Sequence, residues 1–153
     1  MGIFVYPVNF NSFEMKTLLS AVIFISLLFS SSCKSDNPYT IPYVSVNFNV
    51  YPNGIDSDLG VSRFKYFSQV GFRGIVVYRM GSDQFLAYDR ACTFDTQNTK
   101  AIVAVDPSGL LAVCPVCGSK YLLTDGYPFQ GPAKNPLLQY HTTYDGFKVY
   151  VSN

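Results

Sequence analysis

The sequence predicts a single all-β domain. Beyond residue 43, short apolar or alternating segments recur at regular intervals between turns rich in Gly, Pro and Asp, a pattern typical of antiparallel sandwiches and barrels. The chain contains 12 Tyr and 13 Phe, and aromatic residues favour strands. No segment of this region shows the capped 3.6-residue apolar periodicity that predicts a helix. A length of 153 residues suits one domain.

The predicted strands follow in order from residue 44. Residues 44–51 alternate apolar and mostly polar side chains, which predicts a half-buried strand ending at the turn 52–54. Residues 63–70 fit neither a strand nor a helix clearly. Three hairpins are expected after them, with strands at 75–80 and 84–88, at 101–105 and 110–113, and at 138–142 and 147–151.

The charge pattern excludes one broad class of partner. Charged residues make up 14% of the chain, the net charge is +1, and no basic stripe or acidic tail is present. A nucleic-acid surface needs clustered Lys and Arg to neutralise phosphates. We therefore expect no nucleic-acid partner.

The N-terminus has the organisation of an export signal. Met15 and Lys16 are followed by an apolar run over residues 18–29, by three serines and by Cys33. This resembles the signal of bacterial lipoproteins of the Bacteroidetes type, in which the cysteine carries the lipid. The alternative is an uncleaved membrane anchor, but the apolar run is short against the roughly 20 residues that span a bilayer.

This reading divides the chain into four parts. Residues 1–14 precede the better start at Met15 and are expected to be an over-called start, and residues 15–32 are the signal peptide. Residues 33–43 form a polar, Pro-containing tether, and residues 44–153 form the folded domain. The product is expected to be exported and anchored in the cell envelope, at the outer membrane, through lipid on Cys33.

Two cysteine motifs and a proline loop follow predicted strands. Cys92-Thr93-Phe94 comes after strand 84–88, and Cys114-Pro-Val-Cys117-Gly-Ser closes strand 110–113. The loop Gly131-Pro-Ala-Lys-Asn-Pro-Leu137 lies in a longer loop, 126–136, that leads into the last hairpin. These motifs resemble the two ligand boxes and the covering proline loop of a Rieske [2Fe–2S] domain. The resemblance extends over residues 44–153 and implies an antiparallel β-sandwich with a small, loop-rich cluster-binding subdomain.

The ligand set departs from the pattern of that family. A Rieske centre uses two cysteines and two histidines, and the resemblance places Cys92 and Cys114 at the cysteine positions. Phe94 and Cys117 stand at the histidine positions, and a phenyl ring has no donor atom. The sole histidine, His141, falls within predicted strand 138–142 and is expected to be a structural or exposed residue.

The three cysteines of the domain leave several chemistries open. In an exported protein, the family positions imply a disulfide from Cys92 to Cys114 or to Cys117. A zinc or iron site could use Cys92, Cys114 and Cys117 with a water or Asp95 as the fourth ligand. A Cys114–Cys117 redox pair is a third alternative, although the following Gly-Ser favours a turn over the helix usual for such pairs.

The combined prediction is an envelope lipoprotein with a degenerate Rieske-like domain. It is expected to lack a standard cluster and to act as a disulfide-stapled structural or interaction module. The alternatives are a Rieske-type [2Fe–2S] electron-transfer protein with atypical ligation, serving an oxidoreductase, and a thiol- or metal-binding redox protein. The chain shows no Ser/His/Asp set, phosphate loop or paired carboxylates, so no catalytic residue is assigned. The lipid anchor predicts the membrane as one partner, and no protein partner is identified.

Overall fold

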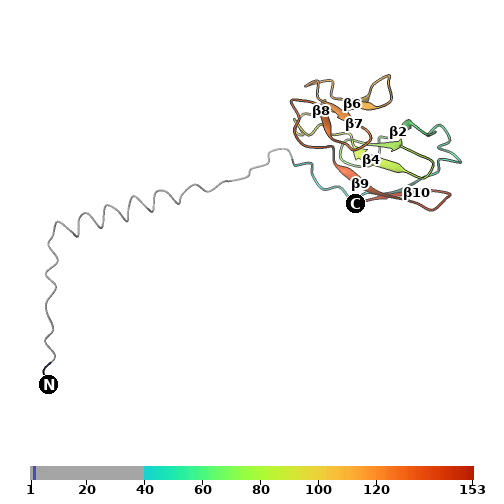
Figure 1. Cartoon of the computed structure of the whole chain (residues 1–153), viewed down its shortest axis with the longest axis horizontal. Coiled ribbons are helices and arrows are strands. Elements are labelled where there is room, and N and C mark those ends of the chain that lie inside the picture. Colours follow the sequence, from blue (N-terminus) through green and yellow to red (C-terminus); the bar gives the residue numbers. More distant parts are fainter. Residues whose placement is uncertain (1, 3–39) are drawn as a thin grey trace. The chain divides into compact units, whose positions relative to one another are not determined.

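The computed structural model describes Gly2 and residues 40–153 (Figure 1). The start, the signal peptide and the lipid site at Cys33 all lie outside the described residues. Within the described part of the chain, the regular structure consists of ten strands, and no helix there is long and apolar enough to cross a membrane. The strands are β1 (Asn47–Val50), β2 (Arg63–Phe67), β3 (Ile75–Arg79), β4 (Phe85–Asp89), β5 (Ala104–Val105), β6 (Leu111–Val113), β7 (Lys120–Leu122), β8 (Pro128–Gln130), β9 (Gln139–Tyr144) and β10 (Val149–Ser152).

The strands form two antiparallel sheets. The larger sheet has the order β1-β10-β9-β4-β3-β2, and the smaller has the order β5-β6-β7-β8. Figure 1 shows β6, β7 and β8 on one side of the larger sheet. The all-β sandwich with a small loop-rich subdomain, expected from the sequence, is therefore confirmed.

Strand β3 explains why the core has two halves. Its first four residues, Ile-Val-Val-Tyr, are all buried, and successive side chains of a strand point to opposite faces. Val76 and Tyr78 pack in the cluster that also contains residues of the smaller sheet, while Ile75 and Val77 pack with residues of β9 and β10. Both faces of the larger sheet are thus covered at its centre, which accounts for an apolar run instead of an alternating one.

The hairpins at 75–80/84–88 and 138–142/147–151 are confirmed as β3–β4 and β9–β10, with shifts of one or two residues at most ends. The unassigned segment 63–70 contains β2. The first strand begins at Asn47, later than expected, because the side chain of Asn153 bonds the N–H of Val46 and the carbonyl of Val44.

The hairpin expected at 101–105 and 110–113 is confirmed as β5–β6, but two other expectations for the smaller sheet were wrong. The segment expected as strand 101–105 is divided: Val103 N–H bonds to Arg90 O and Cys92 N–H to Ala101 O, so only residues 104–105 continue into β5. The loop expected over 126–136 contains strand β8, which pairs with the unpredicted strand β7. Three-residue strands give too short a pattern for periodicity to detect.

Candidate functional site

The three cysteines of the domain meet at one end of the smaller sheet. Cys92 follows β4, Cys114 follows β6, and Cys117 lies in the turn that enters β7. Their sulfur atoms all lie within 4.8 Å of one another, and Cys92 Sγ is 3.5 Å from Cys117 Sγ. We call the loop 92–96, the turn 114–119 and the proline loop 131–137 together the tip.

A buried carboxylate fixes the chain where it enters the tip. Asp89, at the end of β4, is fully buried. It accepts hydrogen bonds from Phe72 N–H at 2.6 Å, from Ala91 N–H at 2.9 Å and from the Tyr140 hydroxyl at 2.9 Å. A buried carboxylate needs such donors to offset its desolvation. Asp89 therefore joins the backbone immediately before Cys92 to the loop at Phe72 and to Tyr140 in β9.

The turn 114–119 directs backbone amides at the sulfur atoms. It is closed by Gly118 N–H to Cys114 O at 3.0 Å and by Cys114 N–H to Ser119 O at 2.8 Å. Gly118 has φ 74°, in the left-handed region that glycine occupies without strain. The N–H groups of Cys117 and Val116 bond to Cys114, and that of Ser119 bonds to Cys117. Hydrogen bonds of this kind favour the ionised form of a thiol.

The environments of the two thiols in this turn differ. Burial raises the pKa of Cys114 to about 12, against the lowering effect of the Cys117 and Val116 amides. Burial also opposes ionisation of Cys117, but the hydroxyl and N–H of Ser119, together with Cys92 and Cys114, outweigh it and lower the pKa of Cys117. Cys117 is half-buried, whereas Cys92 and Cys114 are fully buried. Cys117 is therefore the most accessible of the three cysteines, and it ionises more easily than Cys114.

Tyr121 connects the cysteines to the proline loop. Its buried hydroxyl lies 3.3 Å from Cys92 Sγ, accepts a bond from Thr93 N–H at 3.2 Å and lies 3.1 Å from Thr93 Oγ1. The Thr93 hydroxyl donates onward to Asn135 O at 2.7 Å, and Ala133 N–H donates to Ser119 Oγ at 3.0 Å. Burial raises the pKa of Tyr121, so the phenol stays protonated at neutral pH.

Three of the other residues considered from the sequence lie outside the cysteine group. Phe94 is 37% exposed and offers no donor atom. His141 is exposed on β9, where its Nε2 lies 3.1 Å from Thr143 Oγ1. Asp95 accepts a bond from Asn98 N–H at 3.3 Å and is not in the group that could hold a metal, so it was the wrong candidate for a fourth ligand.

The sequence did not predict the contacts of the Tyr121 hydroxyl with Cys92 and Thr93. At Ser119 it predicted only a turn. The available signal was the spacing of Ser119 and Tyr121, because residues two apart in an extended segment point to the same side.

The donor set does not fit a standard Rieske cluster. That cluster requires two imidazoles on its second iron, and the only histidine is remote from the cysteines. A single tetrahedral ion fits better, since metal–sulfur bonds of about 2.3 Å place two sulfurs roughly 3.7 Å apart. The three thiols are free. The disulfide expected from Cys92 to Cys114 or Cys117 is thus not formed in this structure, and it stays a prediction.

Comparison with known proteins supports the fold. No protein-family model matches the sequence, and no curated protein is significantly similar to it. The domain is similar to a chain of the complex of reduced oxygenase and oxidized ferredoxin in carbazole 1,9a-dioxygenase. The TM-score is 0.51 and the identity 24%, over 70% of this chain and 93% of the other.

Two further structures are similar at lower scores. The plasma membrane Rieske protein PetC3 from Synechocystis PCC 6803 has TM-score 0.49 and 21% identity, over 72% of this chain and 100% of the other. The ferredoxin of carbazole 1,9a-dioxygenase from Nocardioides aromaticivorans IC177 has TM-score 0.48 and 18% identity, over 71% of this chain and 97% of the other. The fold assignment rests on the first similarity together with the two-sheet topology. The described domain has the Rieske fold.

Proposed function

We propose that this chain is an exported lipoprotein whose Rieske-fold domain binds one metal ion through Cys92, Cys114 and Cys117. The observation that carries the proposal is the convergence of three sulfur atoms within 4.8 Å at the tip. The ion occupies the region where the fold would otherwise hold a [2Fe–2S] cluster.

The ligand chemistry favours a borderline or soft ion. Thiolates select zinc, cuprous copper or iron over magnesium and calcium. A closed structural zinc site has four protein ligands, whereas three protein ligands leave a position for water or an external ligand. The group of described residues that could hold the ion supplies three, so the proposed site has one external ligand.

The surrounding hydrogen bonds support thiolate ligation. The Val116 and Cys117 amides bond to Cys114, Ser119 bonds to Cys117, and the Tyr121 hydroxyl lies beside Cys92. Such partners orient first-shell ligands and stabilise their charge.

Export adds a second argument. Thiols in oxidising compartments form disulfides when their geometry allows it. Metal ligation would protect three thiols this close together from that oxidation. The proposal places the domain at the outer membrane through lipid on Cys33.

Metal analysis of purified protein tests the proposal. We expect one metal ion per chain, and single Cys→Ser changes at positions 92, 114 and 117 should each remove it. Cys33→Ser is the matched control, because it should abolish lipidation and leave the metal content unchanged. Protein without metal would contradict the proposal, and two irons with acid-labile sulfide would instead indicate Rieske-type electron transfer.

A second candidate function is the disulfide-stapled structural module, which the 3.5 Å separation of Cys92 Sγ and Cys117 Sγ favours. A disulfide bond of about 2.05 Å needs only a small further approach. Closing this loop would stabilise the domain by about 3 kcal/mol on the chain-entropy argument. Intact mass spectrometry separates the two functions. A metal-free chain that is lighter by ~2 Da, and in which Cys114 is alkylated after denaturation, would favour the staple.

A further inference from the structure

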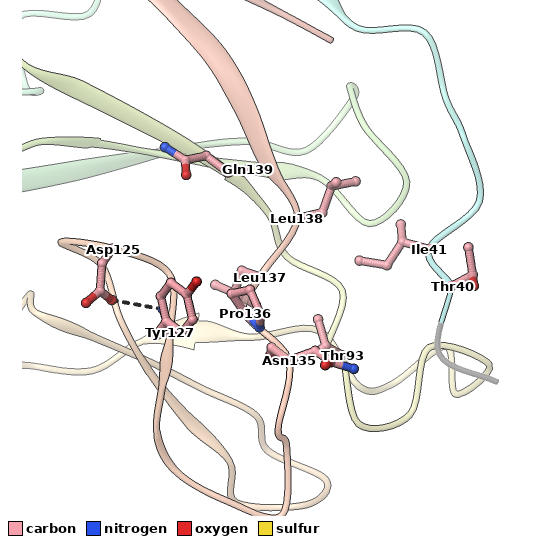
Figure 2. A pocket seen from close by; sticks show the side chains of 10 residues that line it. All are labelled: Thr40, Ile41, Thr93, Asp125, Tyr127, Asn135, Pro136, Leu137, Leu138 and Gln139. Atoms are coloured by element: carbon pink, nitrogen blue, oxygen red, sulfur yellow. Dashed lines mark hydrogen bonds between the residues drawn. The ribbon is translucent and has the colours of Figure 1, made fainter. Parts of the chain in front are cut away.

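Thr40 and Ile41, where the described part of the domain begins, lie beside the tip. Thr40 and Ile41 line a pocket of about 480 Å³ that is also lined by Thr93 and Asn135. Figure 2 shows Ile41 facing Leu138, with Thr93 next to Asn135. Thr93 directly follows Cys92, so the point of entry and the cysteine cluster share one end of the domain.

The other end of the domain is well separated from this entry point. Leu138 and Gln139, which precede and begin β9, line the same pocket, while the turn at 145–148 follows the far end of that strand. At about 3.4 Å per residue, β9 alone separates the two by roughly 20 Å. Figure 1 likewise shows the chain entering near β8 and the β9–β10 turn at the opposite end.

The tether is too short for the tip to move far from a lipid on Cys33. The seven Cα–Cα steps from Cys33 to Thr40 span at most about 25 Å when fully extended. A domain of this length has a radius of gyration of about 13 Å and is therefore roughly 34 Å across. The tether is shorter than the domain is wide, so the end that carries Thr40 stays near the bilayer.

The surface at this end suits a lipid headgroup layer. Only one of the ten residues that line the pocket, Asp125, is charged. Tyr127 is 59% exposed and Leu138 is 38% exposed, and Val116 in the cysteine turn is 46% exposed. Tyrosine and aliphatic side chains around a few polar groups are the composition favoured at membrane interfaces.

We infer that the tip, with the pocket formed by Ile41, Tyr127 and Leu138, rests against the phospholipid surface of the membrane that holds the anchor. The end of the domain that carries the three cysteines then faces the lipid, and the β9–β10 turn points away from it. This inference rests on the lipid anchor proposed above and is independent of the metal.

Single tryptophan reporters test this orientation, because the chain contains no tryptophan. The full chain is produced with its lipid and reconstituted into vesicles of phosphatidylethanolamine and phosphatidylglycerol that carry bromo-phospholipid quenchers. Tyr127→Trp places the reporter beside the pocket. Phe147→Trp places it in the β9–β10 turn at a similar exposure, 67% against 59%, and is the matched control.

We expect lipid-dependent loss of fluorescence and a blue-shifted emission for Tyr127→Trp, and neither for Phe147→Trp. Equal quenching of both variants, or stronger quenching of Phe147→Trp, would overturn the orientation. Flotation of the same samples separates the two proposals. A chain that fails to float with the vesicles refutes the anchor and this inference together, whereas a floating chain with unquenched Tyr127→Trp refutes the inference alone.

Discussion

Gly126→Ala should destabilise the domain far more than the same change in a similar turn. Gly126 has φ 76°, and an added Cβ would lie 2.6 Å from Cε1 of Tyr88, which is fully buried. The left-handed conformation costs an alanine about 1–2 kcal/mol, and overpacking adds about 1–3 kcal/mol. We expect a total near 3 kcal/mol, equivalent to a fall in Tm of roughly 12 °C for a domain of this size.

Gly146→Ala is the matched control for this prediction. Both glycines follow an aspartate whose carboxylate accepts a bond from the residue after the glycine, at 2.9 Å for Asp125 and 2.8 Å for Asp145. Gly146 has φ 93°, but a Cβ there would meet nothing within 4 Å. Only the conformational cost of about 1–2 kcal/mol remains.

Urea and thermal unfolding followed by circular dichroism measure both variants. A further consequence concerns the tip, since Gly126 O accepts the bond from Leu137 N–H that anchors the end of the proline loop. Gly126→Ala should therefore also speed alkylation of the buried thiols. Equal losses of stability in the two variants would show that the contact with Tyr88 is not tight, and would refute the reasoning.

The chemistry of the tip can be probed in four further ways. Phe94→His with Cys117→His restores two imidazoles, so iron should rise to two per chain with a potential of roughly −150 to +300 mV; a folded double variant without iron would show that this tip cannot hold the cluster. In metal-free, reduced protein, Cys117 should be alkylated first, at pH values below 9.0. Cys114, whose pKa is raised to about 12, should react only above pH 9.0. Peptide mapping that finds the reverse order would contradict these two pKa directions. Because the folded state holds the Cys114 proton more tightly, this thiol should cost stability as pH rises from 9.0 towards 12, an effect that Cys114→Ala should remove. Tyr121→Phe leaves the buried Thr93 N–H without its acceptor and should cost about 1–3 kcal/mol in urea unfolding; an unchanged midpoint would mean that another group takes the bond.

The strands that could be predicted from the sequence are those with enough length for a pattern. β3, β4 and β10 carry runs of Val, Ile, Tyr or Phe between clear turns, and their hairpins were located correctly. β7 and β8 have three residues each, and Pro128 begins β8. Their pairing comes from tertiary contact instead of local preference, and sequence periodicity does not report tertiary contact.

The candidate site, like the strands, could be predicted from the sequence only in part. The cysteines and their motif spacing were visible in the sequence, and they converge as the family resemblance implies. The roles of Tyr121 and Asp89 were not visible, since each joins segments far apart in the chain, Tyr121 reaching Cys92 over 29 residues and Asp89 reaching Tyr140 over 51. A sequence pattern shows which donors exist, and only the fold shows which of them meet.

These contacts explain how a Rieske fold can persist while its ligands change. The segments of the tip are joined by Thr93 to Asn135, by Ala133 to Ser119 and by Tyr121 to the Cys92 loop. None of these bonds uses Phe94, and none needs an imidazole at position 117. Since each hydrogen bond contributes about 1 kcal/mol and together they cross-link the segments, they support the geometry of the tip whatever group is bound there. The residues that mark the fold and the residues that would bind a metal are therefore largely separate sets, and the second set can change without loss of the first.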